Sequence, residues 1–126
     1  MNSKAVDAAM LVMQNHISAL NKHDATGVAA TLHFPHYRLT GVTWQTWETA
    51  DHYFEDFLNR AGSNWKHSAF EDIKVVDSSA EKVHLDAEIQ RFDANDNLII
   101  RFRALWVIVE INGVWAAKLR STFAPG

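Results

Sequence analysis

The sequence predicts an α+β fold in which three N-terminal helices pack on a strongly bent, mostly antiparallel sheet. In the first half of the chain, apolar residues recur at the spacing of an amphipathic helix. From Trp65 onward they alternate with a period of two, as they do in half-buried strands. Asn112-Gly113 then interrupts two such runs, and both residues accept the positive φ of a type I′ turn, so the chain is expected to end in a β-hairpin.

Length and composition narrow the class of protein. The 126 residues fit one domain, and the absence of cysteine excludes disulfides, thiolate metal sites and cysteine nucleophiles. A net charge of −3 without a basic run gives no reason to expect nucleic acid as a partner. No run of about 18 apolar residues and no signal-peptide pattern occurs, so we expect a cytoplasmic protein without a membrane partner.

Each expected helix has a side chain that can cap its N-terminus. The candidate caps are Ser3, Asp24 and Thr46. Pro35 stops the second, short helix, which extends through Leu32, and Gly62 stops the third. The third helix carries an aromatic stripe that begins at Trp47.

The expected strands cover residues 36–42, 65–76, 82–92, 98–111 and 114–123. A two-residue turn at Asn112-Gly113 would set Trp106 opposite Leu119 and place Arg120 on the other face. One face of this hairpin is then almost wholly apolar, and we expect it to face the helices. It consists of Phe102, Ala104, Trp106, Ile108, Trp115, Ala117, Leu119 and Phe123.

The register of the preceding strand stays open. If Asp93 opposes Asn97, the side chains that face the helices are His84, Asp86 and Glu88. A one-residue bulge would instead turn Val83, Leu85 and Ile89 toward the helices. The two registers exchange the faces completely, because the side-chain period of a strand is two.

His36 and Arg38 form the candidate catalytic pair. Alternation places both side chains on one face of the first strand. A guanidinium group can hold a carboxylate or enolate oxygen, and an imidazole can exchange a proton near neutral pH. The candidate ligand-binding residues around this pair are Tyr37, Trp47, His84, Asp86, Phe102 and Trp106. No residue pattern indicates a metal or a cofactor, since Pro35 separates His33 from His36.

Five segments carry a resemblance to a known family. They are Phe34-Pro35-His36-Tyr37-Arg38, Arg91-Phe92-Asp93-Ala94, Leu105-Trp106-Val107, Gly113-Val-Trp115 and Leu119-Arg-Ser-Thr-Phe123. With the order of the elements, they resemble the NTF2-like superfamily, whose SnoaL-like and ketosteroid-isomerase-like members share an α+β cone. The resemblance implies an apolar cavity open at one end and a dimer through the outer sheet face. The aspartate base and the first-helix tyrosine of the ketosteroid isomerases have no counterparts here.

Two functions are compatible with this resemblance, because the fold serves many chemistries. The first is binding of a small apolar or carbonyl- or carboxylate-bearing molecule in the cavity, with cofactor-free acid/base chemistry of an isomerase, dehydratase or cyclase. The second is a non-catalytic dimeric binding or association domain. The homodimer would form through an apolar outer face of Leu105, Val107, Val109 and Ile111, joined in the polar-inside register by Val83, Leu85 and Ile89.

Overall fold

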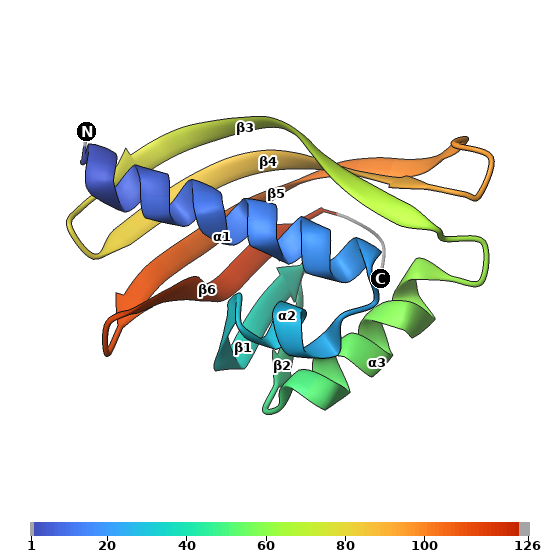
Figure 1. Ribbon diagram of the computed structural model, residues 1–126, viewed down its shortest axis with the longest axis horizontal. Helices are drawn as coiled ribbons and strands as arrows, with labels where there is room; N and C mark the ends of the chain where they lie inside the picture. The colour runs from blue at the N-terminus through green and yellow to red at the C-terminus, as the bar shows by residue number, and fades with distance from the viewer. Residues whose placement is uncertain (1, 124–126) are drawn as a thin grey trace.

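The computed structural model describes residues 2–123 and shows helices packed on one side of a six-stranded sheet (Figure 1). The elements in chain order are α1 (Ser3–Asn21), α2 (Ala25–Ala29), β1 (Leu32–Thr40), β2 (Thr43–Trp47), α3 (Ala50–Ala61), β3 (His67–Ser78), β4 (Lys82–Phe92), β5 (Leu98–Ile111) and β6 (Val114–Thr122). The strand order is β2-β1-β6-β5-β4-β3, and only the β1–β6 pair is parallel. The predicted α+β architecture is confirmed.

The helices begin at side-chain caps, two of which differ from the expected residues. Asn2, rather than Ser3, accepts a hydrogen bond from the first turn of α1, whereas Asp24 caps α2 as predicted. Thr49 caps α3 in place of Thr46, because residues 43–47 form the strand β2. The prediction that Trp47 belongs to the third helix is therefore wrong.

The first strand begins earlier than expected, at Leu32, so α2 does not extend to that residue. Pro35 lies inside β1, where the pairing with β6 is interrupted between Leu32 and Tyr37. A proline is tolerated at such an irregularity because its missing N–H has no ladder partner to lose. Beyond it, regular parallel pairing sets Arg38 beside Arg120.

The C-terminal hairpin turns where the sequence predicts, with φ of 52° at Asn112 and 82° at Gly113. Its register follows the prediction only as far as Ile108, which pairs with Ala117. Lys118 is an extra residue in β6, and Trp106 pairs with Arg120 instead of Leu119. The expectation that Arg120 lies on the outer face is wrong, because this β-bulge turns it inward.

A second bulge decides the register between β4 and β5. Phe92 pairs with Leu98, but Arg91 pairs with Ile100, so Ile99 is the extra residue. Leu85 consequently lies opposite Trp106, and the inward side chains of β4 are those of the bulged alternative. The polar-inside register is wrong, since it would have buried three ionisable side chains without partners.

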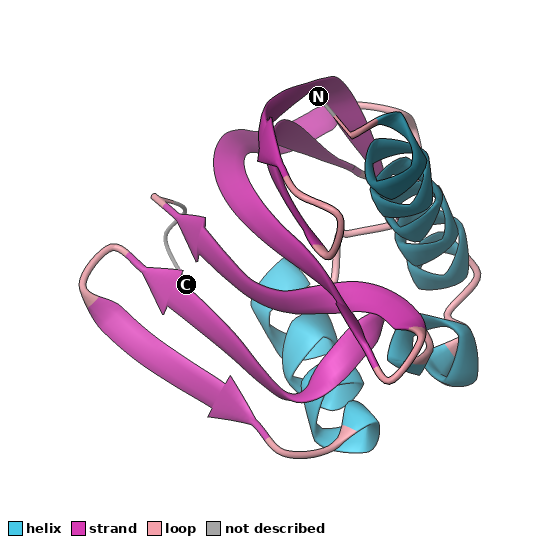
Figure 2. Cartoon of the chain, turned by 90° about the vertical axis from the view of Figure 1, so that its left-hand side faces the viewer, coloured by secondary structure: helices cyan, strands magenta, loops and turns pink. Residues whose placement is uncertain are grey.

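The hydrophobic core lies between α1, α3 and the inner face of the sheet. The sheet bends strongly around this core, and α1 runs across its inner side (Figure 2). Val83, Leu85, Ala87 and Ile108 are completely buried there, together with Trp106 at 1% exposure. Burial of this apolar surface is the main stabilising contribution to the fold.

The positive φ of Gly113 makes the hairpin turn sensitive to substitution. We expect Gly113→Val to lower the free energy of unfolding by about 1–2 kcal/mol, because a β-branched side chain is strained in the left-handed region. The control is Ala94→Val, because Ala94 lies in the exposed β4–β5 turn and does not have a positive φ. This variant should lower the free energy of unfolding by less than about 0.5 kcal/mol. Urea unfolding of both variants measures this difference, and equal costs would contradict the assigned turn geometry.

Candidate functional site

A cavity lies between the inner face of the sheet and the helices α1 and α3. It encloses about 450 Å³ of empty space when its open mouth is included, and the centre of a water-sized molecule can occupy about 30 Å³ of it. The side chains that line it come from seven elements and are His16, Ile17, Leu20, Arg38, Tyr53, Phe57, Ser68, Phe70, Ile89, Arg91, Phe102, Ala104, Trp106, Arg120 and Thr122.

Three arginines give this cavity its charge. Arg38 enters from β1, Arg91 from β4 and Arg120 from β6. Among the described residues, no aspartate or glutamate lines the cavity with them. Arg60 of α3, whose charge also acts on the three arginines, forms an ion pair of 3.1 Å with Asp56. The cavity is therefore a site of concentrated positive charge without a matching negative charge among residues 2–123.

Aromatic rings hold the arginine side chains in place. The guanidinium carbon of Arg120 lies 4.7 Å from the centre of the Trp106 ring, and that of Arg91 lies 5.0 Å from the centre of the Phe102 ring. Such cation–π contacts position a guanidinium group but leave its N–H groups in the plane available. In the described part of the chain, Nε and Nη2 of Arg120 and Nε of Arg91 are buried without a hydrogen-bond partner. These donors can bind an anion.

The charge of the cluster is reflected in the pKa values of the arginines. Burial, followed by repulsion from the neighbouring guanidinium groups, lowers the pKa of Arg38 to about 9 and that of Arg91 to about 10. The pKa of Arg120 is also lowered, mainly by burial. With these pKa values, Arg38 and Arg91 still carry a positive charge at neutral pH.

Tyr53 is the ionisable group at the centre of the arginine cluster. It is 1% exposed, and the guanidinium carbons of Arg120 and Arg60 lie 5.5 Å and 5.9 Å from the centre of its ring. Burial alone would raise the pKa of Tyr53, but the surrounding positive charges outweigh burial and lower that pKa below its ordinary value. A phenol in this environment is acidified and can donate a proton, or stabilise negative charge, at the cavity wall.

Comparison with solved structures identifies the fold of this chain. No protein-family model matches the sequence, and no curated protein is significantly similar to it. An NTF2-like protein of unknown function from Pseudomonas putida KT2440 aligns with a TM-score of 0.77 and 14% identity, over 99% of this chain and 89% of that one. An NTF2-like protein of unknown function from Shewanella oneidensis MR-1 aligns with a TM-score of 0.73 and 9% identity, over 97% and 98%.

The chain has the NTF2-like fold. A third neighbour with this fold, a candidate scytalone dehydratase from Novosphingobium aromaticivorans DSM 12444, aligns with a TM-score of 0.71 and 12% identity, over 96% of this chain and 84% of that one. At these identities the likeness concerns the fold, and the chemistry of this NTF2-like cone has to be argued from its own side chains.

The structure places the two candidate catalytic residues differently with respect to the cavity of the cone. Arg38 lines the cavity, but His36 lies behind the wall, fully buried between the rings of Trp47 and Tyr53. Nδ1 of His36 lies 3.1 Å from the carbonyl oxygen of Ala117, and Nε2 is sealed without a partner in the described residues. Burial, followed by the charge of Arg120, lowers the pKa of His36 to about 2. His36 is thus neutral and out of reach of the cavity, so proton exchange by His36 with a ligand is not supported.

Of the candidate ligand-binding residues, some line the cavity and others lie elsewhere. Phe102 and Trp106 line the cavity. Trp47 is buried behind the cavity wall, where its indole donates to Asp56. Tyr37 lies on the opposite face of β1, stacked on Trp44, so its expected place beside the ligand is wrong.

His84 and Asp86 lie on the outer face of β4, where Asp86 accepts a hydrogen bond of 3.1 Å from Arg103. Their assignment to the cavity depended on the register that the bulge at Ile99 overturns. Within residues 2–123, no three histidine, cysteine, aspartate or glutamate side chains are grouped as a metal site would need. No helix in this part of the chain is long and apolar enough to cross a membrane.

Sequence reasoning missed four ionisable residues that line the cavity, His16, Tyr53, Arg91 and Arg120. Tyr53 precedes Phe54 in the helical stripe of α3, so its inward direction was readable from the spacing. The inward direction of Arg91 follows from the bulged register of β4, which the sequence left open. Nothing in the sequence marks Lys118 as an extra residue, so the position of Arg120 had no signal.

The two buried histidines make the stability of the protein sensitive to acid. Burial, followed by the charge of Arg120, lowers the pKa of His16 to about 3 and that of His36 to about 2, whereas both titrate near 6.5 in the unfolded chain. The unfolded state therefore binds more protons below pH 6.5. We expect each histidine to lower the free energy of unfolding, by up to about 1.4 kcal/mol per pH unit, as the pH falls from 6.5 toward 3.

Urea unfolding between pH 7 and pH 4 measures this effect. His16→Phe and His36→Phe should each give a shallower decline than the wild type. The matched control is His52→Gln, which changes a histidine of α3 that is exposed in the folded protein. If all four proteins lose stability equally with acid, the histidines do not carry the pH dependence.

Proposed function

We propose that the cavity binds a small organic anion with an apolar or aromatic body, such as a carboxylic acid. The observation that carries this proposal is the set of three buried arginines, of which Arg91 and Arg120 have unpartnered N–H groups, with no acidic side chain among the described residues lining the cavity. Buried charges of one sign are costly unless they are neutralised, and a planar guanidinium group suits a carboxylate. Phe102 and Trp106 supply an apolar wall for the rest of the molecule.

Tyr53 supports a catalytic form of the same proposal. A carboxylate or enolate oxygen held by Arg120 would lie near the acidified phenol of Tyr53, since the guanidinium carbon of Arg120 is 5.5 Å from the centre of the Tyr53 ring. Tyr53 would then act as the general acid and base in isomerase, dehydratase or cyclase chemistry without a cofactor, in place of His36. The candidate scytalone dehydratase among the structural neighbours is compatible with this reaction class.

Ligand binding tests the arginine cluster directly. We expect benzoate to raise the melting temperature of the wild type and benzamide, its uncharged analogue, to raise it much less. Arg120→Gln should weaken benzoate binding by about 10- to 100-fold, because a lost charge-assisted hydrogen bond costs about 1.5–3 kcal/mol. Isothermal titration calorimetry gives the dissociation constants.

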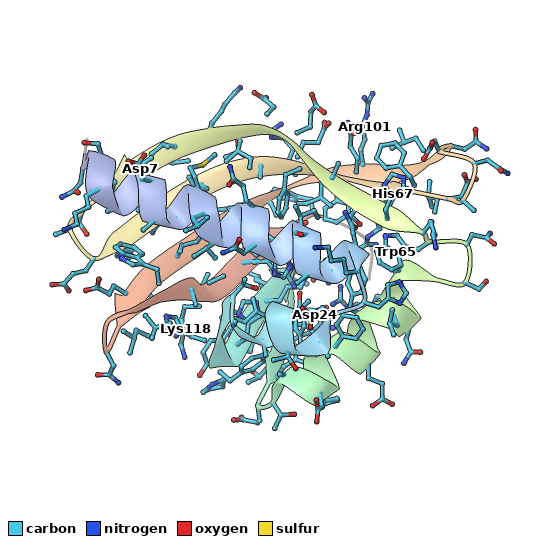
Figure 3. The ribbon with its side chains drawn as sticks, in the orientation of Figure 1. Asp7, Asp24, Trp65, His67, Arg101 and Lys118 are labelled. Carbon is cyan, nitrogen blue, oxygen red and sulfur yellow. The ribbon has the colours of Figure 1, made fainter. Side chains whose placement is uncertain are left out.

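The matched control is Arg101→Gln. Arg101 lies on the same strand as Phe102, but it is exposed and its side chain points away from the helices (Figure 3). This variant should bind benzoate as the wild type does. Arg120→Gln should remain folded by circular dichroism, since it removes a buried charge that has no acidic partner among residues 2–123. Equal affinities for benzoate in all three proteins would refute anion binding by the cluster.

A non-catalytic dimeric binding or association domain remains the alternative, and the outer sheet face bears on it. Leu105, Val107 and Val109 lie on this face, but their neighbours on β4 are Asp86, His84 and Lys82 rather than the expected apolar residues. The apolar area is therefore smaller than the sequence suggested. We infer that this remaining strip still pairs with its symmetry copy.

Light scattering at micromolar concentration should then give about twice the 14.3 kDa mass of the chain. Leu105→Lys should shift the particle toward the monomer, because it places a charge in the centre of the strip. Leu11→Lys, which alters an apolar residue that is 55% exposed on α1, should leave the mass unchanged. A wild-type particle of 14.3 kDa would rule out the dimer.

A further inference from the structure

His16 is a buried histidine on the α1 wall of the cavity, and the anion-binding cluster does not account for it. The residue is 2% exposed. Its ring meets the edge of Trp106 at 5.2 Å between centres and is stacked with Phe70 at 6.4 Å. Its Nδ1 lies 2.9 Å from the hydroxyl oxygen of Thr31. These contacts fix the plane and the direction of the imidazole.

The Thr31 hydroxyl also fixes the position of the proton on the ring. Its oxygen lies 2.7 Å from the carbonyl oxygen of Val28, a distance at which two oxygens need a proton between them. A carbonyl oxygen only accepts, so the single hydroxyl proton points to Val28. The Thr31 oxygen must then accept from His16, whose Nδ1 carries the proton. The neutral imidazole that results has an unprotonated Nε2.

Nε2 is the ring nitrogen that remains for the cavity, which His16 lines. It lies on the side of the ring away from Thr31, and no described residue is hydrogen-bonded to it. In contrast to Nε2 of His36, it is not sealed within the protein. Burial, followed by the charge of Arg120, lowers the pKa of His16 to about 3, so Nε2 stays an acceptor across the physiological pH range.

We propose that His16 is a second recognition point in the cavity, at which Nε2 accepts a hydrogen bond from a hydroxyl or N–H group of the ligand. The inference rests on the proposed function, in which the anionic group of the same ligand binds the arginines. The substrate class becomes narrower: a ring-sized organic anion that also carries a hydrogen-bond donor, as a hydroxybenzoate does.

The position of the two recognition points sets the length of the ligand. His16 and the guanidinium carbon of Arg120 both contact the Trp106 ring, at 5.2 Å and 4.7 Å from its centre. A molecule that reaches both groups therefore needs to span little more than this indole. One six-membered ring with a carboxylate and a hydroxyl group has that length.

Matched pairs of probes separate the two recognition points. We would measure the affinities of 3- and 4-hydroxybenzoate, and of the corresponding methoxybenzoates, by isothermal titration calorimetry. For at least one pair, the wild type should prefer the hydroxyl compound by about tenfold or more, because a ligand without a donor leaves Nε2 buried and unpaired. In His16→Phe this preference should fall to about one, while the preference for benzoate over benzamide is kept.

Thr31 tests whether the tautomer matters, since it acts on the ligand only through His16. In the ¹⁵N spectrum of the labelled wild type, Nδ1 of His16 should be protonated and Nε2 should not. Thr31→Val should lose this tautomer preference and most of the selectivity for hydroxybenzoate, whereas Thr31→Ser should retain both. If Thr31 acted only through packing, Thr31→Ser would not restore the tautomer of His16 in the ¹⁵N spectrum.

The outcomes distinguish the two proposals. If benzoate is preferred over benzamide but the hydroxyl and methoxy compounds bind equally to the wild type, the role of His16 is refuted and anion binding stands. If benzoate binds no better than benzamide, anion binding fails and the role of His16 fails with it. A His16 ring protonated at Nε2 in the wild type would overturn the inference independently of any ligand.

Discussion

The chemistry of the cavity depends on two extra residues in the sheet. Ile99 in β5 and Lys118 in β6 each interrupt the pairing for one position. Because side chains alternate across a strand, each bulge exchanges the faces of the residues beyond it. The bulge at Ile99 turns Arg91 and the apolar residues of β4 toward the helices. The bulge at Lys118 turns Arg120 inward beside Arg38. Without these bulges, the same sequence would place a different set of side chains in the interior.

The resulting interior combines a well-packed apolar core with a costly cluster of charge. The cost is visible in the lowered pKa values of Arg38 and Arg91, which reflect burial and mutual repulsion. Aromatic stacking and the hydroxyl of Tyr53 offset part of this cost but supply no full negative charge. An anion of the proposed kind would offset the remainder, so its affinity would have the same origin as this electrostatic cost.

The parts of the fold that follow from local patterns were predictable. The helical stripe of α1, the cap at Asp24, the stop at Gly62 and the turn at Asn112-Gly113 are all encoded within a few residues. The short strand β2 was missed because five residues show too little periodicity to be distinguished from the start of a helix.

Predictions about the site were less successful, because they depended on register. The inward direction of Arg38 follows from alternation in one strand, and so does that of Trp106 and Phe102. The position of Arg120 depends on a bulge that is set by packing across the whole sheet, and no local residue pattern encodes it. The depth of His36 and the sealing of its Nε2 likewise come from the rings of α3 and β2 that close over it.

The strand order has a consequence for the way this protein is made. β6 lies between β1 and β5, so the first two strands join the rest of the sheet only through the last strand of the chain. During synthesis the edge of β1 that later binds β6 has no partner until residues 114–122 have left the ribosome. Arg38 and Arg120 meet at this same contact, so the proposed anion site requires β6 to be in place. A nascent chain that stops before β6 would expose two unpaired strand edges, which is a known hazard for aggregation.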